Sequence, residues 1–384
     1  MSDVPATPAI GPTILQVLPA LETGGVERGT VEIAAAIARA GGVPLVASAG
    51  GRLVPSVERA GGRNIILPLV GRTPWRIWRN AAALTKIIRD NNVALVHARS
   101  RGPAWSAWLA CRRTGARFVT TYHGAYNENF PFKRRYNAIM ARGEIVIAIS
   151  DFISNIVQTR HAVKKSRIRI IPRGVDPAIF DPAAVTSARI IALAGKWRLP
   201  DGRPTIMLPG RLTRWKGQRV LVAALARMRN KDAVVLLVGA DQGRDKYARE
   251  ISELAARLGV ADRVRMLGQC DDMPAAFKLS DIVVNASIEP EAFGRVVIEA
   301  QAMACPVIAA DHGGAAETIA HGRTGWLVPP GDADALAAAL DYVLDMSAAA
   351  RAEFGAAARA EVAQRYTVQA MQDATIAVYS ELLG

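Results

Sequence analysis

The sequence predicts an α/β protein built on two parallel sheets, and three observations support this prediction. Short apolar runs rich in β-branched residues alternate with helical patterns along the chain, which is typical of parallel sheets with helices on both faces. An apolar share of 51% and a charged share of 21% are those of a globular protein. With 384 residues, the chain is long enough for two domains that each have a core.

In the first half, the run TILQVLP (13–19) has the pattern of a buried strand, and GTVEIAAAIARAGG (29–42) has that of the helix after it. The later strands of this half are predicted at residues 44–49, 64–69, 94–99, 117–124, 145–150 and 168–176. Several prolines between residues 177 and 204 indicate a linker region, so the first domain is predicted at residues 1–190.

The second half repeats the alternation and predicts a domain at residues 191–365. Its strands are predicted at residues 205–211, 233–239, 264–269, 281–287, 306–311 and 325–330. Helical patterns lie between them, for example at 218–228 and 246–259. The last segment, VQAMQDATIAVYSELLG, is amphipathic and predicts a C-terminal helix within residues 366–384.

The charge is unevenly distributed. Residues 1–190 hold 26 Lys and Arg against 11 Asp and Glu, a balance of +15, whereas residues 191–384 hold 22 against 23, a balance of −1. A basic first half indicates an anionic partner, such as nucleic acid, an anionic membrane or a phosphorylated substrate. A generally basic surface, produced by a genome that favours arginine, remains the alternative.

The cysteines and the N-terminus bear on the compartment. Three scattered cysteines give neither a disulfide framework nor a zinc-binding spacing, which indicates a reducing compartment. The N-terminus lacks the basic and apolar regions of a signal peptide, and no apolar run reaches the length of a membrane span. We therefore expect a cytoplasmic protein, and peripheral attachment at the inner face of the cytoplasmic membrane would also fit.

Two short motifs of the first half follow predicted strands. Gly24 and Gly25 lead from the first strand into a helix, where backbone N–H groups suit a phosphate, although a tight turn without function fits as well. His123, in the motif YHG, follows a later strand and could bond a substrate hydroxyl or phosphate. A single histidine is more often structural. Ligands of open parallel sheets bind at the carboxyl ends of the strands, so both positions are candidates.

The segment LPGRLTRWKGQ (208–218) places two cations in a short loop between a predicted strand and helix. Arg211 offers a guanidinium fork and Lys216 a point charge, and together they would neutralise a diphosphate. The segment lacks the GxxxxGK[ST] spacing of a P-loop. A solvated basic turn is the alternative.

The segment EPEAFGRVVIEA (289–300) carries two glutamates eight positions apart. In one helix they would lie about 12 Å apart along the axis, too far to act on one atom. We therefore place Glu291 in a loop, the helix start near Gly294, and Glu299 more than a turn inside the helix. The N–H groups of Phe293, Gly294 and Arg295 would then point at an anion, and each glutamate could hold hydroxyls. This implies a nucleotide sugar; two unrelated exposed glutamates are the alternative.

In their order along the chain, these motifs resemble the family 4 retaining glycosyltransferases, which have the GT-B fold. The resemblance covers nearly the whole chain and rests on these segments: the GG loop, YHG, AISDFISN (148–155), IPRGVD (171–176), PGRLTRWKG, the two-glutamate segment with EAQAMACPVIAADHGGAAETI, GRTGWLVPPGD and the last helix. It implies two Rossmann-like domains that face each other across a cleft, with the last helix packing back on the first domain. Arg173 stands where the family usually has Asn, and Cys305 where Gly is common.

The resemblance also implies roles for the residues. In this family the second domain holds the donor, with Arg211 and Lys216 on the diphosphate, Glu299 on the ribose, and Glu291 with the Phe293, Gly294 and Arg295 amides on the sugar. His123, Gly24 and Gly25 would reach in from the first domain. The family further implies glycosyl transfer with retention, no cofactor and no metal. Among possible hexose donors, GDP-mannose is slightly favoured over UDP- or ADP-sugars by the likeness of the EAFGRVVIEAQAM segment to mannosyltransferases.

The acceptor side is less specific. Aromatic and basic residues cluster in two segments. The first, GRTPWRIWRN, contains Arg72, Trp75, Arg76, Trp78 and Arg79, and the second, NFPFKRRYN, contains Phe130, Phe132, Lys133, Arg134 and Arg135. Arg99 and Arg101 add further positive charge to this half of the chain. Such clusters suit an anionic bilayer or an anionic saccharide. We expect a lipopolysaccharide, lipid-linked or other envelope saccharide as acceptor.

Two other functions fit less of the sequence. A GT-B-fold nucleotide-sugar epimerase would use the same donor without an acceptor. A nucleic-acid-binding protein would explain the basic half, but no RNP, KH, zinc or helix-turn-helix pattern is present.

Overall fold

The computed structural model describes residues 11–22, 24–71, 73–128, 130–241, 243 and 245–384. The chain divides into two compact units. Unit 1 comprises Met1–Arg173 together with Val368–Gly384, and unit 2 comprises Gly174–Thr367. The chain therefore passes from unit 1 into unit 2 and returns for its last segment.

Unit 1 is built on a seven-stranded sheet whose paired strands are all parallel. The strands run in the order β3-β2-β1-β4-β5-β6-β7. Their bounds are β1 Thr13–Val17, β2 Val43–Ser48, β3 Arg63–Ile66, β4 Val93–Ala98, β5 Arg117–Tyr122, β6 Ile145–Ala148 and β7 Ile168–Ile170. The strand order reverses between β1 and β4, and such a switch point is where open parallel sheets bind ligands.

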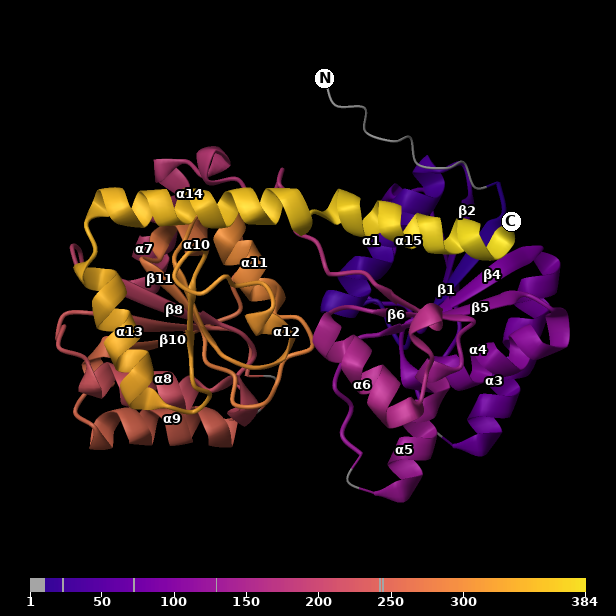
Figure 1. The fold of residues 1–384 in the computed structure, drawn as a ribbon, viewed down its shortest axis with the longest axis horizontal. Helices are drawn as coiled ribbons and strands as arrows, with labels where there is room; N and C mark the ends of the chain where they lie inside the picture. The colour runs from indigo at the N-terminus through magenta and orange to yellow at the C-terminus, as the bar shows by residue number, and fades with distance from the viewer. Residues whose placement is uncertain (1–10, 23, 72, 129, 242, 244) are drawn as a thin grey trace. The chain divides into compact units, whose positions relative to one another are not determined.

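Helices cover the sheet of unit 1 (Figure 1). Their bounds are α1 Gly25–Arg39, α2 Val54–Arg59, α3 Pro74–Asp90, α4 Arg101–Thr114, α5 Pro131–Asn137, α6 Asp151–His161 and α15 Val368–Leu383. The C-terminal helix α15 lies against α1, far from it in sequence, and buries Met371, Ile376 and Tyr379 in a core that it shares with α1 and the central strands. Unit 1 therefore needs residues from both ends of the chain.

Unit 2 repeats the architecture with a six-stranded parallel sheet in the order β10-β9-β8-β11-β12-β13. The strands are β8 Thr205–Pro209, β9 Val234–Val238, β10 Val264–Gly268, β11 Ile282–Asn285, β12 Val307–Ala310 and β13 Trp326–Val328. The helices are α7 Ser187–Trp197, α8 Gln218–Arg227, α9 Asp245–Arg257, α10 Met273–Leu279, α11 Arg295–Ala302, α12 Gly313–Ala316, α13 Ala333–Asp345 and α14 Ala348–Arg365. A strand-order reversal between β8 and β11 gives this sheet a switch point too.

The units divide at Arg173, earlier than the expected boundary at residue 190. The expected linker contains a helix, α7, which packs against α10 through the buried side chains of Leu193 and Trp197. The Arg189 guanidinium also donates hydrogen bonds of 2.9 and 2.7 Å to the Asp272 carboxylate at the start of α10. These contacts place α7 in unit 2.

Every strand expected from the sequence is present, but each ends before the predicted run does. The run 117–124, for example, gives a strand that ends at Tyr122, and the run 205–211 gives one that ends at Pro209. The remaining residues form the loops at the carboxyl ends of the strands. His123 and Arg211 therefore lie in loops at the edges where parallel sheets bind ligands.

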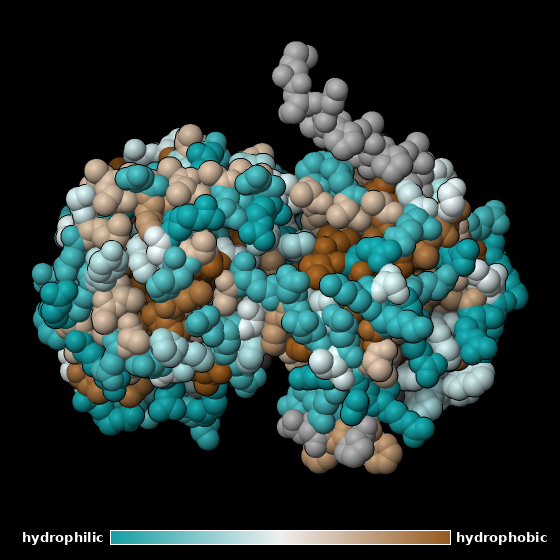
Figure 2. Space-filling model, in the orientation of Figure 1, coloured by the Kyte–Doolittle hydropathy of each residue, from teal (hydrophilic) through white to brown (hydrophobic). Residues whose placement is uncertain are grey.

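The surface of unit 1 carries exposed aromatic side chains on and beside two helices. Trp75 and Trp78 on α3 are exposed, as are Phe130 and Phe132 at α5, where the Phe132 side chain is 82% exposed. Figure 2 shows tan, apolar side chains at the lower edge of this unit, where Figure 1 places α5. In the part of the chain that the structure describes, no helix is both long and apolar enough to span a bilayer.

Candidate functional site

The loop after β8 holds the two predicted cations of unit 2. Gly210 follows β8 and packs closely against Gly239. A Cβ added at Gly239 would lie 2.1 Å from the Gly210 carbonyl oxygen, so a side chain there would displace this loop. Arg211 is exposed at the strand end, whereas Lys216 ends a 3-10 turn and is largely buried. The Lys216 ammonium lies 4.5 Å from the centre of the Trp215 ring. Both cations therefore sit at the carboxyl edge of the sheet.

Glu291 lies beside Lys216 and forms the centre of a polar cluster. Lys216 Nζ donates to Glu291 Oε1 at 2.7 Å, and Ser287 Oγ lies 2.6 Å from the same oxygen. Ser287 Oγ is also 2.8 Å from Asn285 Oδ1, and His312 Nε2 lies 2.8 Å from the Ser287 carbonyl oxygen. Loops after β8 and β11 thus meet at one carboxylate, and the loop after β12 joins them through Ser287.

The electrostatics keep Glu291 ionised. Burial alone would raise the pKa of Glu291, but the Lys216 charge and hydrogen bonds from Lys216, Ser287 and Asn285 outweigh it and lower the pKa below its ordinary value. At neutral pH the cluster therefore contains a carboxylate that can accept hydrogen bonds from ligand hydroxyls, not a group poised to donate a proton.

Helix α11 begins where the sequence predicted. Gly294 caps it with φ 81°, and a Cβ there would lie 2.6 Å from the Ala315 Cβ. Phe293 is buried, with its ring 5.9 Å from that of Tyr366, which fixes the chain just before the helix. Glu299 lies on the second turn, buried, with Oε1 3.5 Å from Arg295 Nε. The helix N-terminus and the two glutamates are thus parts of one unit-2 edge.

The predicted residues of unit 1 lie at its own sheet edge. Gly24 precedes α1 and Gly25 begins it, so the N–H groups of this turn are those of a helix start. His123 follows β5, and its buried Nε2 makes no hydrogen bond within the described residues. Burial, followed by the charges of Arg173 and Arg99, holds the pKa of His123 well below its ordinary value, so the imidazole is neutral.

The predicted acceptor-side arginines and lysine separate into two groups. Arg99 is only 2% exposed and lies beneath α1 and α15, so it is no part of an exposed basic surface. Its position two residues after the buried His97 puts it on the same face of the strand, which explains its burial. Arg101 bonds Asn137 and lies 4.1 Å over the Tyr126 ring.

The second group lies on α5 and faces solvent. Lys133 lies 5.1 Å over the Phe130 ring, and Arg134 donates to the Arg160 carbonyl at 2.7 Å. Arg134 and Arg135 line a hollow of about 480 Å³ together with Arg142 and Arg160. Arg72, also part of the predicted cluster, lies outside the described residues.

The triplet Asp332-Ala333-Asp334 has the Asp-x-Asp form, but Asp332 caps α13 by accepting from the N–H groups of Asp334 and Ala335. Among the described residues no three His, Cys, Asp or Glu side chains are grouped as a metal site would need. Arg211 and Lys216 bring positive charge to the candidate site.

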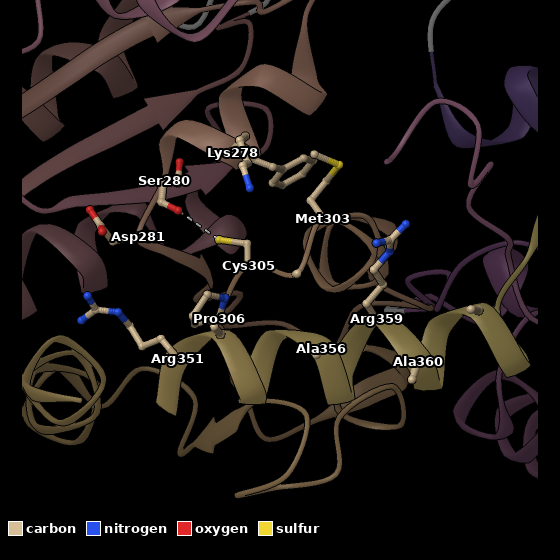
Figure 3. Close-up of a pocket in the computed structure, with 14 residues that line it drawn as sticks. Lys278, Ser280, Asp281, Met303, Cys305, Pro306, Arg351, Ala356, Arg359 and Ala360 are labelled. Atoms are coloured by element: carbon tan, nitrogen blue, oxygen red, sulfur yellow. Dashed lines mark hydrogen bonds between the residues drawn. The ribbon is translucent and has the colours of Figure 1, made fainter. Parts of the chain in front are cut away.

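A hollow of about 720 Å³ in unit 2 is lined by none of the predicted site residues (Figure 3). It lies between α14 and the start of β12. Its Arg359 pairs with Asp181 at 2.9 Å, and Arg351 donates to two backbone carbonyls. The Cys305 thiol donates to the Ser280 carbonyl, and burial raises its pKa far above the ordinary value, so the thiol is unreactive.

Several members of the site were not predicted from the sequence. Asn285 and Ser287 were within a predicted strand run, yet the rule that placed His123 at a strand end also applies to them. The pairing of Lys216 with Glu291 had no sequence signal, because the two residues are 75 positions apart. Arg173 was noted only as a departure from the family, whereas the structure buries its guanidinium against the start of α1, 2.6 Å from the Gly25 carbonyl oxygen.

Comparisons with known sequences agree with this arrangement. The model of the family described as Glycosyltransferase Family 4 matches residues 23–179, and that described as Glycosyl transferases group 1 matches residues 191–361. A D-inositol 3-phosphate glycosyltransferase of Xylanimonas cellulosilytica is 31% identical over 300 residues, covering 72% of this chain and 69% of the relative. The chain spans between 56% and 66% of the length of the first three curated relatives, which bear the same name.

Solved structures resemble the whole chain. A glycosyltransferase from Rickettsia africae superposes with a TM-score of 0.90 at 39% identity, covering 97% of this chain and 98% of that one. Alr3699/HepE of Anabaena, crystallised with UDP and glucose, gives a TM-score of 0.83 at 25% identity, with 96% and 99% covered. Both structures support a common fold over two parallel-sheet units.

Proposed function

The chain belongs to the family 4 glycosyltransferases of GT-B fold, and on this basis we propose that it transfers a hexose from a nucleotide sugar to an acceptor hydroxyl. The observation that carries the proposal is the unit-2 cluster of Lys216, Glu291 and Ser287 beside the N-terminus of α11. A cation, a carboxylate and a helix N-terminus at one sheet edge suit a ligand that joins phosphates to hydroxylated sugars.

Each residue has a distinct proposed role. Arg211 and Lys216 neutralise the diphosphate, and the N–H groups of Phe293, Gly294 and Arg295 point at the anion. Glu299 accepts hydrogen bonds from the ribose hydroxyls. The ionised Glu291 does the same for the transferred sugar, which agrees with its lowered pKa.

The proposed reaction retains the anomeric configuration. The bond between the anomeric carbon and the leaving phosphate oxygen breaks, and a bond to the acceptor oxygen forms on the same face. The leaving phosphate accepts the proton of the acceptor hydroxyl, so nucleoside diphosphate is the second product. His123 and the turn at Gly24 and Gly25 contribute from unit 1. Because Arg211 and Lys216 supply the positive charge, we expect turnover to persist in EDTA.

The donor and acceptor are proposed at the level of chemical class. GDP-mannose is the first donor to test, from the likeness of the EAFGRVVIEAQAM segment to mannosyltransferases. UDP-glucose is the second, because a structural relative was crystallised with UDP and glucose. For the acceptor we propose an anionic envelope saccharide or glycolipid; a relative named for inositol 3-phosphate supports an anionic acceptor.

A panel of nucleotides tests the proposal. At 100 times its dissociation constant, a bound GDP or UDP should stabilise the protein by about 2.7 kcal/mol, which thermal unfolding resolves. Glu299→Gln should abolish this shift, whereas Glu253→Gln, on the exposed face of α9, should leave it unchanged. If no nucleoside diphosphate raises the melting temperature, or if Glu299→Gln binds normally, the assignment of the site is wrong.

Turnover separates the proposed transferase from an epimerase of the same fold. An epimerase would convert the nucleotide sugar without an acceptor, whereas the transferase should release nucleoside diphosphate at a rate that depends on acceptor concentration. Tight binding of random DNA near physiological salt would instead favour a nucleic-acid-binding protein.

A further inference from the structure

Unit 1 contains a buried cluster of cationic and imidazole side chains, and the proposed reaction uses only His123 among them. Arg99 follows β4, His123 follows β5, and Arg173 lies just beyond β7. The residues Arg99 and Arg173 are 2% and 5% exposed. All three therefore sit at the carboxyl edge of the unit-1 sheet, where ligands of open parallel sheets bind.

Arg99 is incompletely satisfied. Its Nε donates to Gln16 Oε1 at 2.7 Å, but its buried Nη2 makes no hydrogen bond within the described residues. A buried guanidinium N–H without a partner is costly, since it has lost its water and gained nothing in return. Arg99 Nη2 therefore lacks an acceptor, although Gln16 and Tyr379 hydrogen-bond to the rest of the guanidinium.

Arg173 is held firmly beside it. Its Nη2 donates to the Gly25 carbonyl at 2.6 Å and lies 3.8 Å from Glu32 Oε2. A Cβ at Gly29 would lie 2.0 Å from the same nitrogen, so only glycine at that position leaves room for the guanidinium. Arg173 thus adds a fixed positive charge to the cluster.

The nearby histidines do not balance this charge. His97 uses both ring nitrogens, on Tyr379 and Thr121, each at 2.6 Å. Burial, followed by the charge of Arg99, holds the pKa of His97 well below its ordinary value, so this ring is neutral, as His123 is. The cluster contains two arginines and one carboxylate, Glu32, whose charge acts on Arg99. It therefore has an excess of about one positive charge.

The geometry places Arg99 and His123 on the same face of adjacent strands. His97 bonds Thr121 across β4 and β5, and Arg99 and His123 each lie two residues further on. The register pairs His97 with Val119, so Arg99 and His123 are diagonal neighbours just beyond the strand ends, about 8 Å apart from strand spacing and rise, and the long Arg99 side chain can reach across this distance. Arg99 and Arg173, though not His123, also line a cavity of about 10 Å³, which has room for one oxygen atom of an anion and not for the whole group.

We propose that Arg99 Nη2 and His123 Nε2 bind an oxyanion of the acceptor, a phosphate monoester or carboxylate, at the carboxyl edge of the unit-1 sheet. The excess charge of the Arg99–Arg173 pair attracts the anion, and the neutral His123 ring donates one hydrogen bond to it. This inference rests on the proposed transferase function, and it gives the enzyme a reason to prefer charged acceptors.

Inorganic phosphate is the probe for the site. In buffers of matched ionic strength, phosphate should raise the melting temperature of the full-length protein saturably, relative to chloride. Arg99→Gln should weaken phosphate binding by at least about 10-fold, because a charged hydrogen bond is lost. Arg89→Gln removes the same charge from the exposed end of α3 and should bind phosphate like the wild type.

A second arm identifies the source of the anion. GDP and UDP should bind Arg99→Gln as they bind the wild type, because their diphosphate belongs to unit 2. If Arg99→Gln loses nucleotide and phosphate affinity equally, the oxyanion is that of the donor and the inference is overturned. A wild-type protein that responds to nucleotide but not to phosphate overturns it too, while the transferase proposal stands.

Folding of the variant is checked directly. Because Arg99 is an excess buried cation, Arg99→Gln should keep or raise the melting temperature without phosphate. If it unfolds instead, Arg99→Lys provides the test: it keeps the charge but shortens the fork, so it should fold and still bind phosphate more weakly. Wild-type phosphate affinity in Arg99→Lys would overturn the inference.

Discussion

At the scale of single residues, the ion pair of Lys216 and Glu291 has a consequence for ligand binding. The two side chains are mostly buried and 2.7 Å apart, so each fixes the position of the other before any ligand arrives. A diphosphate that reaches Lys216 must share this cation with Glu291. The ammonium has three donors, which makes sharing possible, and preorganisation reduces the entropy lost on binding.

The first prediction concerns this pair. Lys216→Met should destabilise the protein by about 3 kcal/mol, because it leaves Glu291 as a buried charge without its cation. The double variant Lys216→Met/Glu291→Gln should regain much of that loss. Thermal unfolding measures both, and equal losses in the single and double variants would show that the two charges are not coupled.

The second prediction concerns pH. The pKa of Glu291 is lowered in the folded protein, so the stability from its charge is fully present above the unfolded value of about 4.3 and is lost as the pH falls through the folded value. The difference in melting temperature between the wild type and Glu291→Gln should therefore stay constant from pH 7 to 5 and shrink below pH 4.3. A difference that already shrinks between pH 7 and 5 would contradict the lowered pKa.

At the scale of elements, helix α11 depends on how closely it approaches α12. Gly294 has φ 81°, and its Cα faces Ala315 with no room for a methyl group. Glycine at this position therefore permits both a left-handed backbone and a close contact between α11 and α12. Both set the direction in which the α11 N–H groups point.

The third prediction separates these two effects. Gly294→Ala and Gly259→Ala both place alanine at a positive φ, but only the first meets a neighbour, since nothing lies within 4 Å of a Cβ at Gly259. Gly259→Ala should cost about 1 kcal/mol. Gly294→Ala should cost clearly more and weaken nucleotide binding, as measured by thermal shift with GDP and UDP. Equal effects would mean that α11 is not held by this contact.

The elements also show what a sequence can predict. Strand runs such as 205–211 were identified because buried parallel strands are continuously apolar. The start of α11 near Gly294 followed from the same pattern, whereas α7 was taken for a linker because prolines flank it on both sides. Pairs such as Lys216 with Glu291, and the burial of Arg99, could not be predicted, because they depend on which loops and helices meet in space.

At the scale of the whole molecule, unit 1 carries both the excess of positive charge and a set of exposed aromatic side chains. The membrane patch is defined here by these exposed residues: Trp75, Trp78, Phe130, Phe132, Arg76, Arg79, Lys133 and Arg135. Each cation near an anionic bilayer contributes about 1 kcal/mol, and the aromatic rings suit the interface. We propose that this patch attaches the enzyme to a membrane that carries its acceptor.

The fourth prediction follows from the patch. The protein should float with anionic vesicles at low salt and much less at 1 M salt, where the Debye length falls to about 3 Å. Phe132→Ser combined with Trp75→Ser should reduce flotation. Ile191→Ser removes a comparably exposed apolar side chain from unit 2 and should not. Equal flotation with neutral and anionic vesicles would argue against the patch.

The return of α15 to unit 1 affects how the protein is made. During synthesis the ribosome must translate all of residues 174–367 before it reaches the helix that completes the first core. Until then, the nascent unit 1 exposes the apolar surface that Met371, Ile376 and Tyr379 later cover. We therefore expect unit 1 to mature after unit 2 despite being translated first, and chains cut off before α15 to need a chaperone to stay soluble.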